Sequence, residues 1–228
     1  MIARIVEEHL GEDIRKLKIR ILSGLVLVKL FVVGILWLKP LFHLLMILVA
    51  IGMLTEWYNM THSSSLHSLL GLIIIPVPIS LLILLSTDDT KNWLIMLYFG
   101  IIWSADGFAM IGGKVFKGLK LAPKISPRKT WSGLISGVLA SSLVAVLISL
   151  SPNFQIESYY FSNKVYLFLF GCVMALIGQL SDLFISYFKR KFKVKDSGHL
   201  IPGHGGVLDR FDSIILTAPL LFLINLYL

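Results

Sequence analysis

The chain has 228 residues, of which 56% are hydrophobic, and it carries a formal net charge of +8. Its mean hydropathy of +0.83 lies outside the range of an ordinary water-soluble domain, so a soluble globular protein is excluded. A β-barrel is excluded because the apolar runs do not alternate with polar residues. The single cysteine, Cys172, excludes an intramolecular disulfide.

Seven apolar runs follow one another, each close to the length of about 20 residues that crosses the hydrocarbon core of a bilayer. They lie at about 21–38, 41–57, 69–86, 92–111, 131–150, 165–188 and 211–228. We therefore expect an all-α, polytopic integral membrane protein with about seven transmembrane helices. Residues 1–228 would form one membrane-embedded catalytic domain. Pro76 and Pro78 predict a kink in the third helix.

The basic residues are concentrated in three segments. Segment 1–20 holds five Lys and Arg residues, segment 112–130 holds six, and segment 189–210 holds six. Cytoplasmic loops of membrane proteins are rich in Lys and Arg, so this distribution predicts a cytoplasmic N-terminus and two cytoplasmic loops at 112–130 and 189–210. The same residues would attract anionic lipid headgroups.

Five acidic residues lie in or at the ends of apolar runs, where an ionisable group is costly and usually functional. They are Glu56, Asp106, Asp182, Asp209 and Asp212. Asp209 and Asp212 are three residues apart, so a helix beginning near Leu208 would carry both on one face. Asp182 ends the preceding run on the same side. These three carboxylates would repel one another unless a hard cation such as Mg²⁺ bound them; the alternative for Asp209 alone is a helix N-cap.

A glycine-rich turn precedes Asp209. It runs from Pro202 to Gly206 and contains Gly203, Gly205 and Gly206. Exposed backbone amides just before a helix are suited to binding phosphate. His204, in the same turn, is predicted to bind phosphate; the alternatives are that it donates a proton to a leaving group or stabilises the turn.

A second basic loop, at 120–133, offers Ser126, Lys129 and Thr130 just before the fifth predicted helix, where a phosphate can also be held. The simpler interpretation is that Ser126 caps the helix and the lysines mark the cytoplasmic face. Asp106 lies about one turn inside the fourth run and either joins the same cavity or packs against a lysine. Lys29, midway through the first run, either extends to the membrane surface or pairs with an acidic residue, for which Glu56 is the best candidate although its depth argues against the contact.

The segment SDLFISYFKRKFKVKDSGHLIPGHGGVLDRFDS, Ser181–Ser213, resembles the signature of the phosphatidate cytidylyltransferase family, also called CDP-diacylglycerol synthases. A serine, Lys-Arg, Lys-Asp, Pro-Gly-His-Gly-Gly and Asp-Arg-x-Asp occur at the family's spacing. The block LAPKISPRKTW resembles the family's second motif. The chain departs from the family at Ser132, where many members have Glu, and after Asp106, where many have Asp-Thr-Gly-Ala-Tyr.

The resemblance implies a nucleotidyltransferase that transfers CMP from CTP to phosphatidate, giving CDP-diacylglycerol and pyrophosphate. It implies a Mg²⁺ cofactor, of one or two ions, with Asp182, Asp209 and Asp212 as metal ligands. The implied catalytic residues are these three aspartates with Lys195, Asp196, His204 and Arg210. The implied substrate-binding residues are Ser126, Lys129, Thr130, Lys189, Arg190, Gly203, Gly205 and Gly206. The expected partners are CTP and membrane-embedded phosphatidate, with no nucleic acid and a plausible homodimer. The expected location is a bacterial inner membrane, with the active site facing the cytoplasm.

Two other functions fit parts of the pattern. A CTP-dependent lipid kinase of the phytol or dolichol type would phosphorylate a hydroxyl acceptor and would need a base beside it. An ion-coupled transporter would use the acidic residues as an ion path, but transporters place such groups near the bilayer midplane and often show repeated halves. Here the acidic residues gather on one side and no internal repeat is present.

Overall fold

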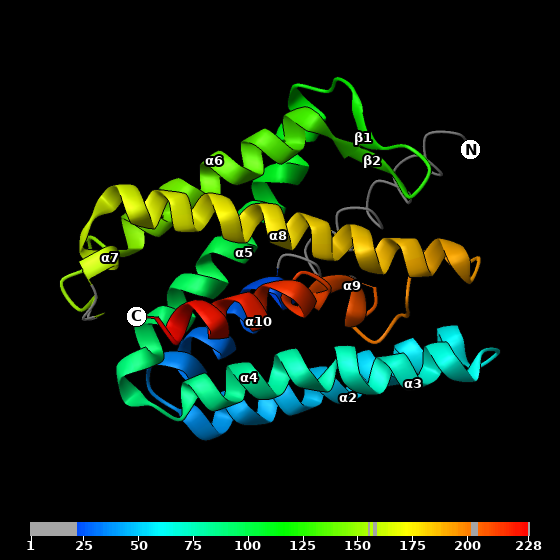
Figure 1. Cartoon of the computed structure of the whole chain (residues 1–228), viewed down its shortest axis with the longest axis horizontal. Helices are drawn as coiled ribbons and strands as arrows, with labels where there is room; N and C mark the ends of the chain where they lie inside the picture. Colours follow the sequence, from blue (N-terminus) through cyan, green and yellow to red (C-terminus); the bar gives the residue numbers. More distant parts are fainter. Residues whose placement is uncertain (1–21, 155, 157–158, 202–204, 228) are drawn as a thin grey trace, which may run out of the picture.

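A computed structural model of the protein describes residues 22–154, 156, 159–201 and 205–227. The described chain is mostly helical (Figure 1). It begins with an apolar helix, Leu22–Leu36. The following elements are α2 (Lys39–Thr61), α3 (Ser65–Ile74), α4 (Pro76–Ser86), the 3-10 helix η1 (Asp89–Lys91), α5 (Asn92–Val115), β1 (Lys120–Ala122), β2 (Ser126–Thr130), α6 (Trp131–Ile148), α7 (Tyr159–Ser162), α8 (Lys164–Lys191), α9 (Leu208–Phe211) and α10 (Ile214–Asn225).

Five helical stretches among the described residues are long and apolar enough to cross a membrane. They are Lys39–Thr61, Ser65–Ser86, Asp89–Val115, Trp131–Ile148 and Lys164–Lys191. An integral membrane protein is therefore confirmed. The first and last predicted spans correspond to shorter helices, Leu22–Leu36 and the pair α9 and α10. The basic segment 1–20 lies outside the described residues.

The kink predicted in the third span is confirmed. Helix α3 ends at Ile74 and α4 starts at Pro76, because proline has no N–H to continue the hydrogen-bond ladder and its ring crowds the preceding turn. By contrast, the loop 112–130 is not wholly irregular. It contains an antiparallel hairpin in which Lys120 pairs with Thr130 and Ala122 pairs with Ser126.

Helix α10 lies between α4 and α8, and α8 extends across the molecule (Figure 1). The short helix α9, which precedes α10 in the chain, is held in place by two apolar side chains. Leu208 is fully buried, and the ring of Phe211 lies 5.8 Å from that of Phe31, centroid to centroid. The last predicted span is thus anchored at its beginning by the aromatic core.

Helices α5 and α6 approach each other closely through small residues. A Cβ added to Gly133 would lie 2.6 Å from the carbonyl oxygen of Ala109, and one added to Gly137 would lie 2.7 Å from that of Ala105. Small residues at such contacts allow two helix backbones to approach, which is a common mode of packing in membranes. This packing brings the end of α5 and the hairpin beside α8.

Candidate active site

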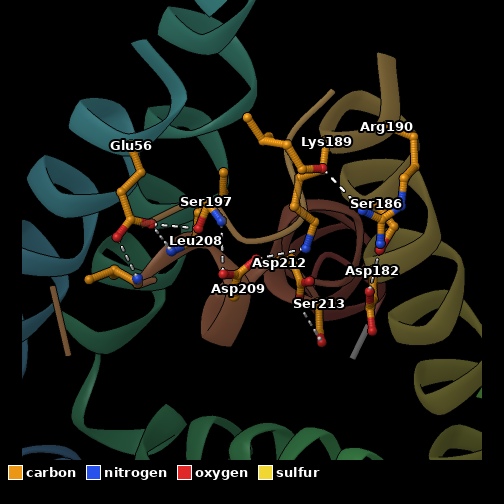
Figure 2. Close-up of polar contacts among 12 residues, drawn as sticks. Glu56, Asp182, Ser186, Lys189, Arg190, Ser197, Leu208, Asp209, Asp212 and Ser213 are labelled. Carbon is orange, nitrogen blue, oxygen red and sulfur yellow. Dashed lines mark hydrogen bonds and ion pairs between the residues drawn. The ribbon is translucent and has the colours of Figure 1, made fainter. Parts of the chain in front are cut away.

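Five of the predicted site residues lie close together where the C-terminal half of α8, the short helix α9 and the hairpin β1–β2 meet: Lys129, Asp182, Lys189, Asp209 and Asp212. Figure 2 shows Lys189 of α8 directed towards Asp209, with Asp212 beside this pair and Asp182 on the same helix as Lys189. Lys189 is only 7% exposed, and its ammonium lies 2.7 Å from the Asp209 carboxylate. It also experiences the charges of Asp212 and Asp182. The three aspartates therefore gather around one buried ammonium group, as their common side of the membrane predicted.

Asp182 is held by two side chains. It forms an ion pair with Lys129 of β2, and one of its oxygens accepts a hydrogen bond from Ser186, one turn along α8, at 3.1 Å. The ion pair joins the second basic loop to α8. Lys129 is thus the residue of the predicted Ser126, Lys129 and Thr130 set that reaches the acidic cluster directly.

Asp212 is the most deeply buried of the three predicted acids, with 5% of its surface exposed. It lies close enough to Asp182 and Asp106 to experience their negative charges, and close enough to Lys189 and Lys129 to be partly compensated. Ser213 donates a hydrogen bond to Asp106 at 3.3 Å. Asp106 therefore joins the cluster, which the sequence left open as one of two alternatives.

A small hollow of about 10 Å³, room for about one water molecule, lies beside the cluster and is lined by residues of α5, α6 and α8. Its polar lining is formed by Asp106, Gln179 and Ser213, and most of its remaining walls are alanine, glycine and aliphatic side chains. A space of this size is too small to hold a substrate by itself.

The hairpin residues have defined structural partners. Thr130, rather than Ser126, caps α6, because its hydroxyl accepts a hydrogen bond from the N–H of Gly133 at 3.1 Å. Arg190 donates hydrogen bonds to the backbone carbonyls of Ile125 and Val194 at 2.9 and 3.1 Å. Arg190 therefore ties the hairpin to the end of α8.

The signature loop after α8 is only partly described. Lys195, Asp196 and Arg210 are exposed, whereas Gly206 is buried. Gly205 has a φ of +91°, a conformation that glycine adopts readily. Gly203 and His204 lie outside the described residues, so their predicted roles stay predictions.

Two residues of this region were not predicted as site residues. Glu56 does not pair with Lys29; its carboxylate accepts hydrogen bonds from Ser197, Val207 and Leu208. Ser181 hydrogen-bonds to the backbone of the turn between α9 and α10. For Glu56, the sequence signal was its position as an acidic residue inside an apolar run. For Ser181, the only sequence signal was its position next to Asp182.

Oxygen ligands of the kind that Mg²⁺ prefers are present in this cluster. Both oxygens of Asp182 are engaged, by Lys129 and Ser186, and both oxygens of Asp209 are engaged, by Lys189 and the N–H of Ser197. Within the described ranges, no group of three or more His, Cys, Asp or Glu residues is arranged closely enough to hold a metal ion. The predicted set of three metal ligands therefore stays a prediction.

Comparison with known proteins was consistent with this site. A family model described as "Cytidylyltransferase family" matches residues 61–228. Proteins named phosphatidate cytidylyltransferase from Rickettsia felis and Rickettsia conorii are each 70% identical to the chain, over 99% and 100% of its length and all of their own. A protein of the same name from Brucella abortus is 39% identical over 57% of this chain and 45% of its own length. The chain therefore belongs to the phosphatidate cytidylyltransferase family.

Proposed function

We propose that the protein transfers CMP from CTP to phosphatidate, forming CDP-diacylglycerol and releasing pyrophosphate. The observation that carries the proposal is the convergence of Asp182, Asp209 and Asp212 around Lys189, at the signature that the chain shares with its family. The protein is accordingly a nucleotidyltransferase of phospholipid biosynthesis. Its substrates are a soluble nucleotide and a lipid, so the reaction requires a site at the membrane boundary.

The chemistry needs charge neutralisation more than it needs a base. A phosphate monoester has a second pKa of about 6, so the phosphatidate phosphate carries close to two negative charges at neutral pH and is already nucleophilic. One of its oxygens bonds to the α-phosphorus of CTP while the bond from that phosphorus to the pyrophosphate oxygen breaks. Lys129 and Lys189 supply positive charge where two anions must approach. Lys195 and Arg210, both exposed, would bind the triphosphate.

The cofactor that we propose is Mg²⁺, held by Asp182 and Asp212 with Asp106 beside them. A bound divalent cation would screen the repulsion between the two substrates and stabilise the pyrophosphate leaving group. Asp209 would act mainly by orienting Lys189, because its second oxygen is held by the backbone of Ser197.

We further propose seven crossings, in which Leu22–Leu36 and the α9–α10 pair complete the five long spans. The basic loops 112–130 and 189–210 then face the cytoplasm, where CTP is available, and the membrane is a bacterial inner membrane. A homodimer stays a prediction.

The test is an assay of the purified protein with phosphatidate, Mg²⁺ and labelled CTP. Label on the cytidine should enter the lipid fraction, whereas label on the γ-phosphate should leave as pyrophosphate. Transfer of the γ-phosphate label to lipid would instead indicate the lipid kinase. Asp212→Asn should abolish CDP-lipid formation while the protein stays folded in detergent, and near-normal turnover by this variant would contradict the assigned role of Asp212.

A further inference from the structure

We propose that Glu56 of α2 is a positioning residue that fastens the base of the signature loop, residues 197–208, against the transmembrane bundle. The proposal deepens the function proposed above and rests on it for its kinetic consequences. Glu56 is 2% exposed and lies at least 141 residues from each of its partners in the sequence. No part of the shared signature includes it.

Both carboxylate oxygens of Glu56 accept hydrogen bonds, and the donors come from the two ends of the loop (Figure 2). At the first end, the hydroxyl of Ser197 donates to Oε2 at 2.8 Å. At the other end, the N–H of Leu208 donates to Oε2 at 2.9 Å and the N–H of Val207 donates to Oε1 at 3.0 Å. The Glu56 side chain therefore connects Ser197 to Val207 and Leu208, at the start of α9.

The loop is shaped to fit around this carboxylate. A Cβ added to Gly198 would lie 2.4 Å from Oε1 of Glu56, and one added to Gly206 would lie 2.6 Å from Oε2. Real Cβ atoms essentially never approach so closely. The two glycines thus allow both ends of the loop to reach Glu56, and a larger residue at either position would separate them.

The contacts continue from Glu56 into the acidic cluster. Ser197 donates its hydroxyl to Glu56 and its backbone N–H to Oδ2 of Asp209 at 3.0 Å, and the other oxygen of Asp209 binds Lys189. Glu56 itself touches none of the three predicted acids in these contacts. Its role is to fix the loop that orients Asp209, and through it the ammonium group of Lys189.

A carboxylate is required because all three partners are donors. In Glu56→Gln, one oxygen becomes an NH₂ group that cannot accept a hydrogen bond, so at least one donor of the loop base is left facing another donor. Hydrogen bonds to charged groups are the stronger class, so we expect kcat/KM for CDP-lipid formation to fall at least about tenfold. We expect the loss mainly in kcat, because the oriented groups act on the charge that develops during transfer.

The experiment compares the full chain in detergent with Glu56→Gln, Ser197→Ala, Ser197→Thr and Leu82→Ala. Leu82 is fully buried in α4, so Leu82→Ala reports a general loss of packing. Hydrogen exchange of the amides of Val207 and Leu208 is measured alongside the kinetics. In Glu56→Gln, exchange of these two amides should become faster than in the wild type. In Leu82→Ala, it should become faster only to the extent that the whole protein opens more often. Ser197→Thr, which keeps the hydroxyl, should recover the kcat that Ser197→Ala loses.

The double variant Glu56→Gln/Ser197→Ala should lose less activity than the two single losses combined, because both changes act on one set of hydrogen bonds. Unchanged exchange at Val207 and Leu208, or a wild-type kcat/KM in Glu56→Gln, would overturn the proposal. If the wild-type protein formed no CDP-lipid, the proposed function would fail, whereas the exchange measurement would still decide whether Glu56 fastens the loop.

Discussion

The hydroxyl of Ser181 in α8 donates a hydrogen bond to the backbone carbonyl of Asp212, at the turn between α9 and α10. The same hydroxyl accepts the N–H of Leu216 at 3.2 Å. In an uninterrupted α-helix, the N–H of Leu216 would bond directly to the carbonyl of Asp212. Ser181 is thus inserted into the helix ladder, and such an insertion is a recognised cause of helix breaks. The break fixes where the buried Asp212 leaves the helix.

Replacing Ser181 by alanine should therefore change Asp212 more than it changes the rest of the protein. Ser181→Ala leaves the N–H of Leu216 without its partner, or lets the ladder close and rotates Asp212 away from Asp182. We expect CDP-lipid formation to fall at least about tenfold, since one unsatisfied buried polar group costs about 1–3 kcal/mol. The measurement is kcat/KM together with the melting temperature in detergent.

Ser141→Ala is the matched control for this variant. Ser141 is as fully buried as Ser181, but its hydroxyl donates within its own helix, to the carbonyl of Val138 at 2.9 Å. The control should retain activity. Equal activity losses in the two variants would show that Ser181 acts only through general stability.

The convergence of the acidic residues could be predicted from the sequence, whereas the groups that hold them could not. Asp182, Asp209 and Asp212 are marked by their position at the ends of apolar runs, and hydropathy alone brings those ends to one side of the membrane. Glu56 and Ser181 bind backbone or hydroxyl groups of distant segments. Backbone partners leave no pattern of complementary side chains that could be recognised in a single sequence.

Two structural features were not predicted from the sequence, a break near the start of the last span and a hairpin in the loop 112–130, because both depend on contacts between segments. A straight helix was expected from 211 to 228, but a hydroxyl from another helix interrupts the ladder near its start. The hairpin within 112–130 was also missed, because only a few residues pair and Pro123 and Pro127 make the segment resemble an irregular loop. Local composition indicated neither feature.

Removing the central ammonium group tests whether the acids can hold a metal. In Lys189→Met, the carboxylates lose the charge that compensates them, and breaking a mostly buried ion pair costs about 3–5 kcal/mol. We expect a lower melting temperature than in the wild type. Added Mg²⁺ should raise that temperature more in Lys189→Met than in the wild type, because the cation can replace the lost positive charge. Differential scanning fluorimetry with and without Mg²⁺ measures both effects.

Lys39→Met provides the control for an exposed ion pair. Lys39 binds Asp89 at 2.6 Å, but the Asp89 side chain is 90% exposed, so its loss should cost less than about 1 kcal/mol and should give no special response to Mg²⁺. If Lys189→Met responded to Mg²⁺ no more than the wild type does, the proposed metal site would be wrong.

The close approach of α5 and α6 should tolerate no added methyl group at Gly137. Gly137→Ala would place a Cβ 2.7 Å from the carbonyl oxygen of Ala105, and overpacking of this kind typically costs about 1–3 kcal/mol. Gly107→Ala, in α5, is the matched change, because a Cβ there meets nothing within 4 Å. We expect Gly137→Ala to lower the melting temperature and Gly107→Ala to leave it equal or slightly higher, since alanine favours the helix. Equal melting temperatures for the two variants would contradict the described helix contact.

The hydroxyl of Thr130 was predicted to bind substrate, and its contacts now separate that role from helix capping. Thr130 is 4% exposed, and its oxygen accepts the N–H of Gly133 and contacts the hydroxyl of Ser132 at 3.0 Å. Loss of an N-cap costs about 0.5–2 kcal/mol, so Thr130→Val should lower the melting temperature and Thr130→Ser should restore it. With the hydroxyl engaged in this way, KM for CTP should stay within about twofold of the wild type in both variants. A Thr130→Val protein of normal stability but with a clearly raised KM for CTP would instead assign the hydroxyl to the nucleotide, and would require that it leave Gly133 when CTP binds.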